Sequence, residues 1–209
     1  MIIPKANITH HKKITDINDL AKLINDVYTY DGHYSTKNSL KFCLHIPLRA
    51  SNLVNLKWSY ISFEDKSLTI PRSLMKNKNK NLPDFKVPLS DTVIKILEEQ
   101  KEFTNHQDFI FLSAKGKPIN DNTPNMALVK MGYKNTQKLH GFRGVFRSLA
   151  DTFQKEHSLD YEVKKRFLDH HDDNRVELSY NHRAEYFEQM KPLVNWWSGF
   201  IDKLVKEIK

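Results

Sequence analysis

The sequence contains a single cysteine, Cys43, so no disulfide can form within the chain. Because Cys43 lies in the apolar run Leu40–Leu44, we expect a buried thiol in a protein of a reducing compartment. The chain has no run approaching the roughly 18 apolar residues of a membrane span, and residues 1–13 contain no hydrophobic signal core. These absences argue against a secreted, disulfide-stabilised protein and against a membrane protein.

Glycine is also scarce, with 6 among 209 residues, and there is neither an internal repeat nor a low-complexity segment. The length suits one sizeable core or at most two small domains, and the apolar content is that of an ordinary globular protein. A repeat architecture is therefore not expected.

Acidic side chains are in the minority: 25 Asp and Glu stand against 33 Lys and Arg, which gives a formal net charge of +8. A basic excess suggests a polyanionic partner. Residues 71–86 contain one acid, Asp84, among the basic residues Arg72, Lys76, Lys78, Lys80 and Lys86. This segment is either a solvated loop or a basic finger that lies along a phosphate backbone.

Apolar spacing predicts helices in the N-terminal part of the chain. Thr15 is the expected cap of a helix whose apolar stripe consists of Leu20, Leu23, Ile24 and Val27. A second helix is expected to start at Ser35 and to be interrupted by Pro47, and a short third helix is expected over residues 50–58.

The pattern changes period near residue 60. Apolar runs at residues 60–63, 67–70 and 85–89 predict a small antiparallel sheet, and Ser90 is the expected cap of the next helix. Residues 109–112 are expected to form a short strand or turn. The chain after about residue 120 reads as helical, with Pro192 expected to kink or divide the last helix. The predicted fold is mainly α with a small three-stranded antiparallel β-sheet.

Scattered side chains supply the groups that cutting and rejoining a phosphodiester requires without a metal; they are Arg49, Lys76, His140, Arg143, His170 and Tyr180. Planar, bidentate arginines suit the non-bridging oxygens of a phosphate. An imidazole that titrates near neutrality can accept a proton. A phenol, with a free pKa of about 10, becomes a nucleophile when cations and a base assist it. Each residue alone has a plainer interpretation, such as a surface cation, a capping histidine or a core tyrosine.

Four segments, in this order, match the motifs of a known family. They are Leu48–Trp58, then residues 70–76 with 87–90, then Leu139–Arg143, and finally Leu168–His170 with Val176–Asn181. The first resembles the family's first arginine box, the second the hairpin that carries its lysine, the third the His-x-x-Arg box, and the fourth the box that ends in the nucleophile. The chain thus resembles the catalytic domain of tyrosine recombinases, within the phage and genomic-island integrase group. The resemblance implies this catalytic domain for residues 15–209, with residues 1–14 as a linker or tail.

The resemblance also implies a role for each candidate. Arg49 and Arg143 bind the scissile phosphate, and His140 takes the phenol proton. His170 donates a hydrogen bond to the phosphate, and Tyr180 is the nucleophile. Two neighbours are alternatives, namely His171 for His170 and Tyr186 for Tyr180.

By the resemblance, Lys76 corresponds to the lysine that protonates the leaving 5′ oxygen. A flexible ammonium suits this role because it can follow a leaving group. Lys78 and Lys80 are rivals for this role. Together with Arg72 they are otherwise expected to bind DNA.

The implied reaction is site-specific DNA recombination, in which strands are cleaved through a 3′-phosphotyrosyl intermediate and then rejoined. It needs no metal ion, other cofactor or small-molecule ligand. The implied partners are double-stranded attachment-site DNA and further copies of the chain, which form a tetramer on DNA. The implied location is the bacterial cytoplasm, in association with the nucleoid. The alternative is a catalytically silent DNA-binding remnant. A metal-dependent hydrolase built on residues 170–173 is disfavoured, because adjacent side chains cannot all converge on one ion.

Two features depart from the family pattern. Asn52 stands where an acid often follows the first arginine, and an amide cannot neutralise a guanidinium. The family usually carries a helical DNA-binding domain upstream, so this chain is expected to be a fragment of a longer integrase. Near the C-terminus an apolar stripe, Val194, Trp197, Ile201 and Leu204, either packs on its own domain or is donated to a neighbouring subunit.

Overall fold

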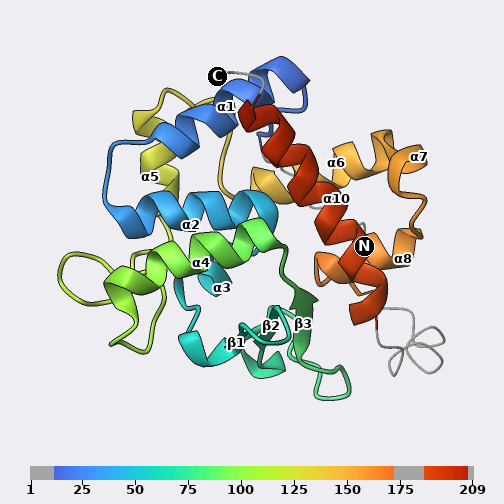
Figure 1. Cartoon of the computed structure of the whole chain (residues 1–209), viewed down its shortest axis with the longest axis horizontal. Helices are drawn as coiled ribbons and strands as arrows, with labels where there is room; N and C mark the ends of the chain where they lie inside the picture. The colour runs from blue at the N-terminus through green and yellow to red at the C-terminus, as the bar shows by residue number, and fades with distance from the viewer. Residues whose placement is uncertain (1–11, 172–185, 207–209) are drawn as a thin grey trace, which may run out of the picture.

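A computed structural model describes residues 12–171 and 186–206. Helices make up most of the molecule, and the small sheet lies at one end of it (Figure 1). The N-terminal half contains α1 (Ile17–Thr29), α2 (Tyr34–His45), α3 (Ala50–Val54), the 3-10 turns η1 (Trp58–Tyr60) and η2 (Arg72–Leu74), strands β1 (Ile61–Ser62), β2 (Ser67–Ile70) and β3 (Phe85–Pro88), and α4 (Asp91–Thr104). The C-terminal half contains α5 (Thr123–Lys130), α6 (Gly141–Thr152), α7 (Gln154–His157), α8 (Tyr161–Phe167) and α10 (Phe187–Lys206). The prediction of a mainly helical fold with a three-stranded sheet is confirmed.

The sheet is antiparallel in the order β1-β2-β3. Leu68 of β2 pairs with Val87 of β3, and both side chains are fully buried. Pro88 ends β3, which is an edge strand, where the missing N–H of proline is tolerated. The chain between β2 and β3 contains η2 and the basic segment seen in the sequence.

Helix starts follow local capping. The side chain of Asp16, rather than that of Thr15, caps α1 by accepting hydrogen bonds from the backbone N–H groups of Asn18 and Asp19. The predicted cap was therefore wrong by one residue, because a carboxylate accepts two N–H bonds at once and its charge also suits the helix N-terminus. Ser90 caps α4 as predicted, accepting from the N–H of Val93 at 3.3 Å.

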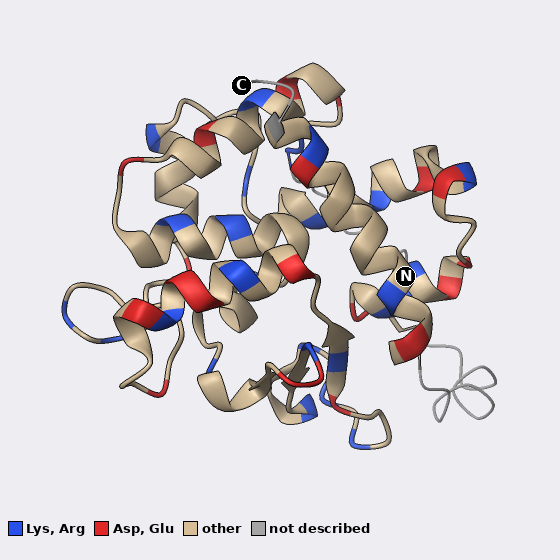
Figure 2. Ribbon diagram, in the orientation of Figure 1, with Lys and Arg blue, Asp and Glu red and all other residues tan. Residues whose placement is uncertain are grey.

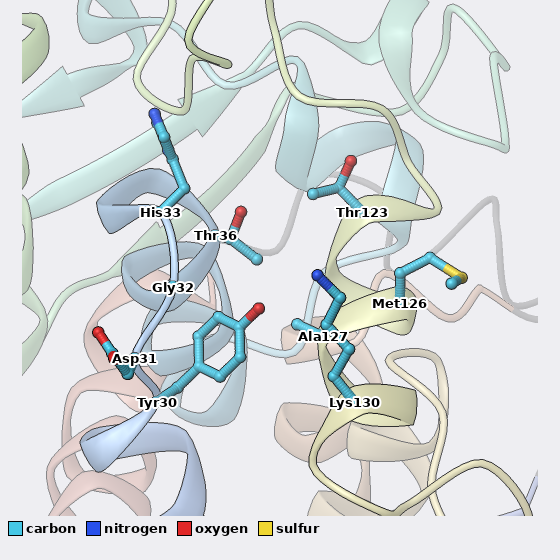
Figure 3. A pocket seen from close by; sticks show the side chains of 9 residues that line it. All are labelled: Tyr30, Asp31, Gly32, His33, Thr36, Thr123, Met126, Ala127 and Lys130. Carbon is cyan, nitrogen blue, oxygen red and sulfur yellow. The ribbon is translucent and has the colours of Figure 1, made fainter.

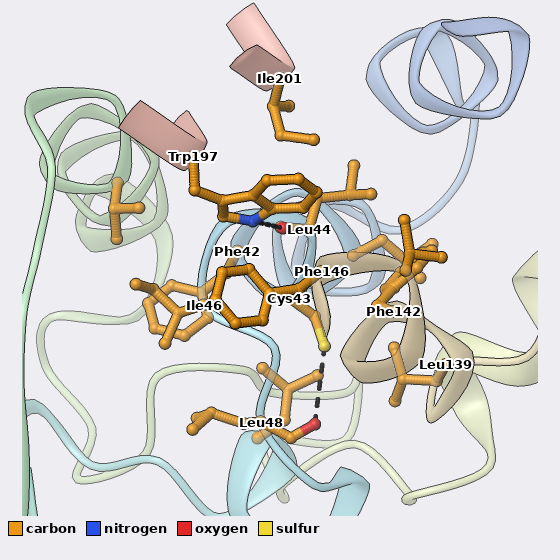
Figure 4. Packing of buried hydrophobic residues seen from close by; sticks show 14 of the residues in the cluster. Phe42, Cys43, Leu44, Ile46, Leu48, Leu139, Phe142, Phe146, Trp197 and Ile201 are labelled. Atoms are coloured by element: carbon orange, nitrogen blue, oxygen red, sulfur yellow. Dashed lines mark hydrogen bonds between the residues drawn. The ribbon is translucent and has the colours of Figure 1, made fainter. Parts of the chain in front are cut away.

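The core is centred on aromatic side chains from the C-terminal helices. Trp197 of α10 contacts Phe146 of α6 at 5.4 Å between ring centroids, and Phe146 contacts Phe167 of α8 at 4.9 Å. The indole N–H of Trp197 donates to the carbonyl of Leu44 in α2 at 2.9 Å (Figure 4). Cys43 is buried beside this cluster, as predicted, and burial raises the pKa of its thiol to about 12.

Helix α10 lies against its own domain. It contacts α1, α2, α8 and β3, and its apolar stripe is buried, as shown by Met190, Leu193, Val194, Trp197, Ile201 and Leu204. The stripe thus packs within the chain. The helix also continues through Pro192 and is not divided there. Proline removes one backbone donor near the start of α10, and buried side chains on both sides of it hold the helix together.

A buried polar chain joins α10 to α1 and α2. His45 is fully buried, and its ring nitrogens are hydrogen-bonded to the hydroxyl of Tyr28 at 2.9 Å and to that of Ser198 at 3.0 Å. The hydroxyl of Ser90 donates to that of Ser198 at 2.8 Å. Burial lowers the pKa of His45 from 6.5 to about 3. His45 is therefore neutral in the folded chain at every pH at which the protein is expected to work.

This pKa predicts loss of stability in mild acid. Below pH 6.5 the unfolded chain binds a proton at His45 that the folded chain cannot bind, so the free energy of unfolding falls as the pH falls toward about 3. Between pH 7 and pH 4.5 this one group should cost about 2–3 kcal/mol. Urea denaturation at several pH values should therefore give a steeper pH dependence for the unchanged chain than for His45→Gln. Parallel curves for the two chains would contradict the assignment.

Candidate active site

Arg143 lies on α6, and its side chain turns into the protein, leaving the residue 5 % exposed. Its guanidinium donates to the carbonyl of Pro47 at 2.8 Å and to that of Leu168 at 2.5 Å. Pro47 stands between α2 and α3, and Leu168 is the C-cap of α8. A helix C-terminus has carbonyls without intrahelical donors and a partial negative charge, so a guanidinium is stabilised there. Backbone atoms from two distant segments thus fix Arg143.

His170 lies next to this guanidinium, with its Nε2 3.0 Å from NH2 of Arg143. Because a guanidinium can only donate, Nε2 is the acceptor, and the neutral ring carries its proton on Nδ1. Partial burial, together with the charges of Arg143 and Arg49, lowers the pKa of His170 to about 4. At neutral pH the ring is therefore a hydrogen-bond donor without positive charge.

Arg49 occupies the N-cap position of α3, with its side chain 19 % exposed. Its NH1 donates to Oδ2 of Asp169 at 3.1 Å. Burial and the charge of Arg49 lower the pKa of Arg143 to about 10, which still leaves Arg143 protonated at neutral pH. The structure therefore brings Arg49, Arg143 and His170 together in one group, which we call the arginine cluster.

Asp169 is a member of this cluster that the sequence interpretation missed. Its residue is 4 % exposed, and besides Arg49 it accepts hydrogen bonds from NH1 of Arg72 at 2.7 Å and from Nε2 of His171 at 3.1 Å. Burial opposes ionisation, but the bonds from His171 and Arg72 outweigh it and hold the pKa of Asp169 below its ordinary value. The one sequence signal was an acid placed directly before His170, beyond the predicted helix.

Arg72 is placed differently from the other basic residues of its segment. It is 7 % exposed, and besides Asp169 its side chain donates to the carbonyls of Pro83 at 2.8 Å and Asn77 at 3.3 Å. Its charge is used inside the protein, where it ties the β2–β3 connection to Asp169. The sequence interpretation had placed it among residues that contact DNA.

Asn52 does not support Arg49. Its amide donates to the carbonyl of Leu74 at 3.0 Å, so it holds η2 against α3. The carboxylate beside Arg49 is that of Asp169, which comes from the other half of the chain.

Lys76, Lys78 and Lys80 are all exposed on the connection between η2 and β3. Figure 2 shows basic residues on this connection, at the sheet end of the molecule. The bond from Arg72 to the carbonyl of Asn77 places the backbone between Lys76 and Lys78 beside the arginine cluster.

His140 is the N-cap residue of α6 and is exposed, one turn before Arg143. The glycine that follows it is sterically required, because a Cβ on Gly141 would lie 2.4 Å from the carbonyl oxygen of Lys12. Close contact with the backbone of Lys12 thus helps to fix the start of α6.

Tyr180 lies outside the described residues. Its rival Tyr186 is partly buried against the core, and the guanidinium of Arg166 lies 5.4 Å from the centre of its ring. His171, the rival of His170, bonds to Asp169 and also contacts Arg166.

A cavity of about 400 Å³ lies between the α1–α2 connection and α5, lined by residues that include Tyr30, His33, Thr36 and Lys130 (Figure 3). None of the residues of the arginine cluster lines it. Within residues 12–171 and 186–206, no group of three or more His, Cys, Asp or Glu could hold a metal ion. In the same ranges, no helix has the length and apolarity needed to cross a membrane.

Comparison with known families gives a match over most of the chain. The model of the phage integrase family matches residues 13–186. Prophage integrase IntA of Escherichia coli strain K12 is 31% identical over 184 residues, which cover 87% of this chain and 42% of that protein. The chain spans about half the length of the curated relatives that it matches.

Solved structures share the fold. The integrase of transposon Tn1549, in complex with a circular intermediate DNA, superposes with a TM-score of 0.63 at 11% identity, covering 88% of this chain and 66% of that one. A lambda integrase tetramer bound to a Holliday junction gives 0.53 at 15% identity, covering 82% and 51%.

Proposed function

The chain belongs to the phage integrase family, and from this premise we propose that it catalyses site-specific DNA recombination. One observation carries the proposal: Arg49, Arg143 and His170, from three separate segments, meet beside a single buried carboxylate. Two guanidiniums in one cluster suit the non-bridging oxygens of a phosphate. The proposal concerns the catalytic domain of a longer integrase.

The proposed cleavage step exchanges one phosphoester bond for another. The phenol oxygen of Tyr180 attacks the scissile phosphorus, the bond to the 5′ oxygen breaks, and a 3′-phosphotyrosyl bond forms. His140 takes the phenol proton, and Lys76 gives a proton to the leaving oxygen. The freed 5′ hydroxyl later attacks the phosphotyrosine and rejoins the strand. Because each step exchanges one ester for another, the reaction consumes no ATP.

The described residues have distinct parts in this step. Arg49 and Arg143 stabilise charge on the phosphate as the phosphorus becomes five-coordinate. His170, neutral because its pKa is about 4, donates a hydrogen bond from Nδ1 to a phosphate oxygen. Lys78 and Lys80 bind the DNA backbone, and Arg72 positions their loop through Asn77.

The proposed substrate is double-stranded attachment-site DNA, bound by several copies of the protein. A lambda integrase tetramer binds a Holliday junction in one of the matched structures, and we extend a tetrameric assembly on DNA to this chain. The bacterial nucleoid is the proposed location.

The test uses a nicked attachment-site oligonucleotide from the element that encodes the chain. The nick lets a short fragment diffuse away after cleavage, which traps the covalent adduct. We expect a protein–DNA adduct that survives detergent, forms in the presence of a chelator, and maps to the peptide containing Tyr180. Low salt is needed, because each phosphate contact contributes a slope of roughly −0.9 to the salt dependence of binding. A band shift without any adduct would instead identify a DNA-binding remnant.

A further inference from the structure

The geometry points to Asp169 as a positioning residue that holds Arg49 in place for the scissile phosphate, a role that rests on the proposed function. Asp169 is not itself proposed to contact the phenol nucleophile or the leaving 5′ oxygen. It acts through the guanidinium of Arg49, and the turn that carries it also places His170.

The turn at the end of α8 is the first observation. The N–H of Asp169 bonds to the carbonyl of Arg166, and the N–H of His170 bonds to that of Lys165, both at 2.9 Å. These two bonds form a Schellman motif, in which the residue after the C-cap adopts a left-handed conformation. Asp169 has φ 51°, in the region that favours glycine. The backbone of this turn directs His170 toward Arg143.

The side chain at this position is the second observation. A left-handed backbone disfavours any residue with a Cβ, although Asp and Asn tolerate it best. Glycine would make the same turn without that cost. Here the position holds a carboxylate whose oxygens both face arginines: Oδ2 bonds to Arg49 and Oδ1 to Arg72. The carboxylate, and not the turn, is what an aspartate adds at this place.

Charge balance is the third observation. Arg49, Arg72 and Arg143 bring three positive charges to one partly buried place, and Arg49 already lowers the pKa of Arg143. Asp169 is the buried carboxylate that opposes this repulsion. Without a bound phosphate, Arg49 would otherwise turn toward solvent, since its side chain is 19 % exposed. The ion pair uses one of the five N–H groups of the guanidinium, so donors remain for the phosphate.

The experiment compares Asp169→Asn and Asp169→Gly with the unchanged chain in single-turnover adduct formation at saturating DNA. Asparagine keeps the size of the side chain and removes its charge. Glycine keeps the turn and removes the carboxylate. Both should lower the rate by roughly 10²-fold, the effect of a misplaced catalytic group. Ser158→Gly is the matched control, because Ser158 has φ 52° at the C-cap of α7, and its rate should be unchanged.

A second arm separates positioning from a purely structural role. In an Arg49→Ala chain, Asp169→Asn should cause no further loss of rate, because Asp169 acts through Arg49. Equal losses in both backgrounds would overturn the inference. So would a normal rate in both Asp169 variants, or loss of folding in both by circular dichroism. Failure of the unchanged chain to form any adduct would instead remove the proposed function, and this role with it.

Discussion

An Arg143→Ala chain should form the covalent adduct roughly 10³–10⁵-fold more slowly than the unchanged chain, which is the range for loss of a single arginine in phosphoryl transfer. The rate should be measured in single turnover at saturating DNA, so that weaker binding does not enter. Arg143→Lys should recover little of the loss, because an ammonium keeps the charge but not the planar, bidentate donors.

The size of this effect follows from how Arg143 is held. Two carbonyls, those of Pro47 and Leu168, fix its guanidinium before any phosphate arrives. Donors that are already oriented need no reorganisation as charge develops on the phosphate. This preorganisation is the main source of electrostatic catalysis. His170 bonds to the same nitrogen that contacts Leu168. Removal of Arg143 therefore also releases the imidazole that is proposed to face the phosphate.

Folding must be monitored in the same chains. Alanine at position 143 leaves the two carbonyls without their donor, at about 1–3 kcal/mol for each buried unsatisfied group, against a total stability of about 5–15 kcal/mol for a typical domain. Thermal unfolding shows whether the variant is folded at the assay temperature.

Arg147→Ala is the matched control, since Arg147 lies one turn further along α6 and is bonded to Asp151 at 2.8 Å. It removes the same charge from the same helix, and the ion-pair partner of Arg147 is Asp151 and not a member of the cluster. We expect its adduct rate to stay close to that of the unchanged chain. A similar loss in both variants would mean that Arg143 acts only through the charge of the helix.

The fold was largely predictable from the sequence because it depends on local periodicity. The apolar stripe of α1, the alternation in β2 and the cap at Ser90 are each encoded within a few residues. The error at Thr15 arose because two adjacent residues can both cap a helix, and it is the side chain of Asp16 that accepts from two backbone N–H groups. Pro192 is tolerated in α10 because tertiary contacts outweigh one lost hydrogen bond, and a local pattern does not contain those contacts.

The site was less predictable, because its contacts join residues far apart in the chain. Nothing near Arg49 indicated that its carboxylate partner would be Asp169, which follows it by 120 positions. Nor did a run of basic residues distinguish the buried Arg72 from the exposed Lys78. The resemblance to a known family supplied the candidate residues for phosphate chemistry. Which of them support the others depends on tertiary packing.

A Tyr180→Phe chain should form no detectable adduct, while still shifting attachment-site DNA in a binding assay. Phenylalanine keeps the ring but lacks the oxygen that forms the bond to phosphorus, so the covalent intermediate cannot exist. The arginines would still bind the phosphate, and any residual reaction would be attack by water. That reaction leaves a nicked strand without linked protein, which a denaturing gel distinguishes from an adduct.

Tyr186→Phe is the control for this change. Its ring packs on the core beside the guanidinium of Arg166, and phenylalanine preserves that contact, so the adduct should form at an almost unchanged rate. If Tyr180→Phe retained the adduct and Tyr186→Phe lost it, the nucleophile would be Tyr186, and the arginine cluster would still be the phosphate site. If both retained it, the reaction would not proceed through either tyrosine. Only the loss confined to position 180 joins the buried cluster of Arg49 and Arg143 to a phenol nucleophile in one mechanism.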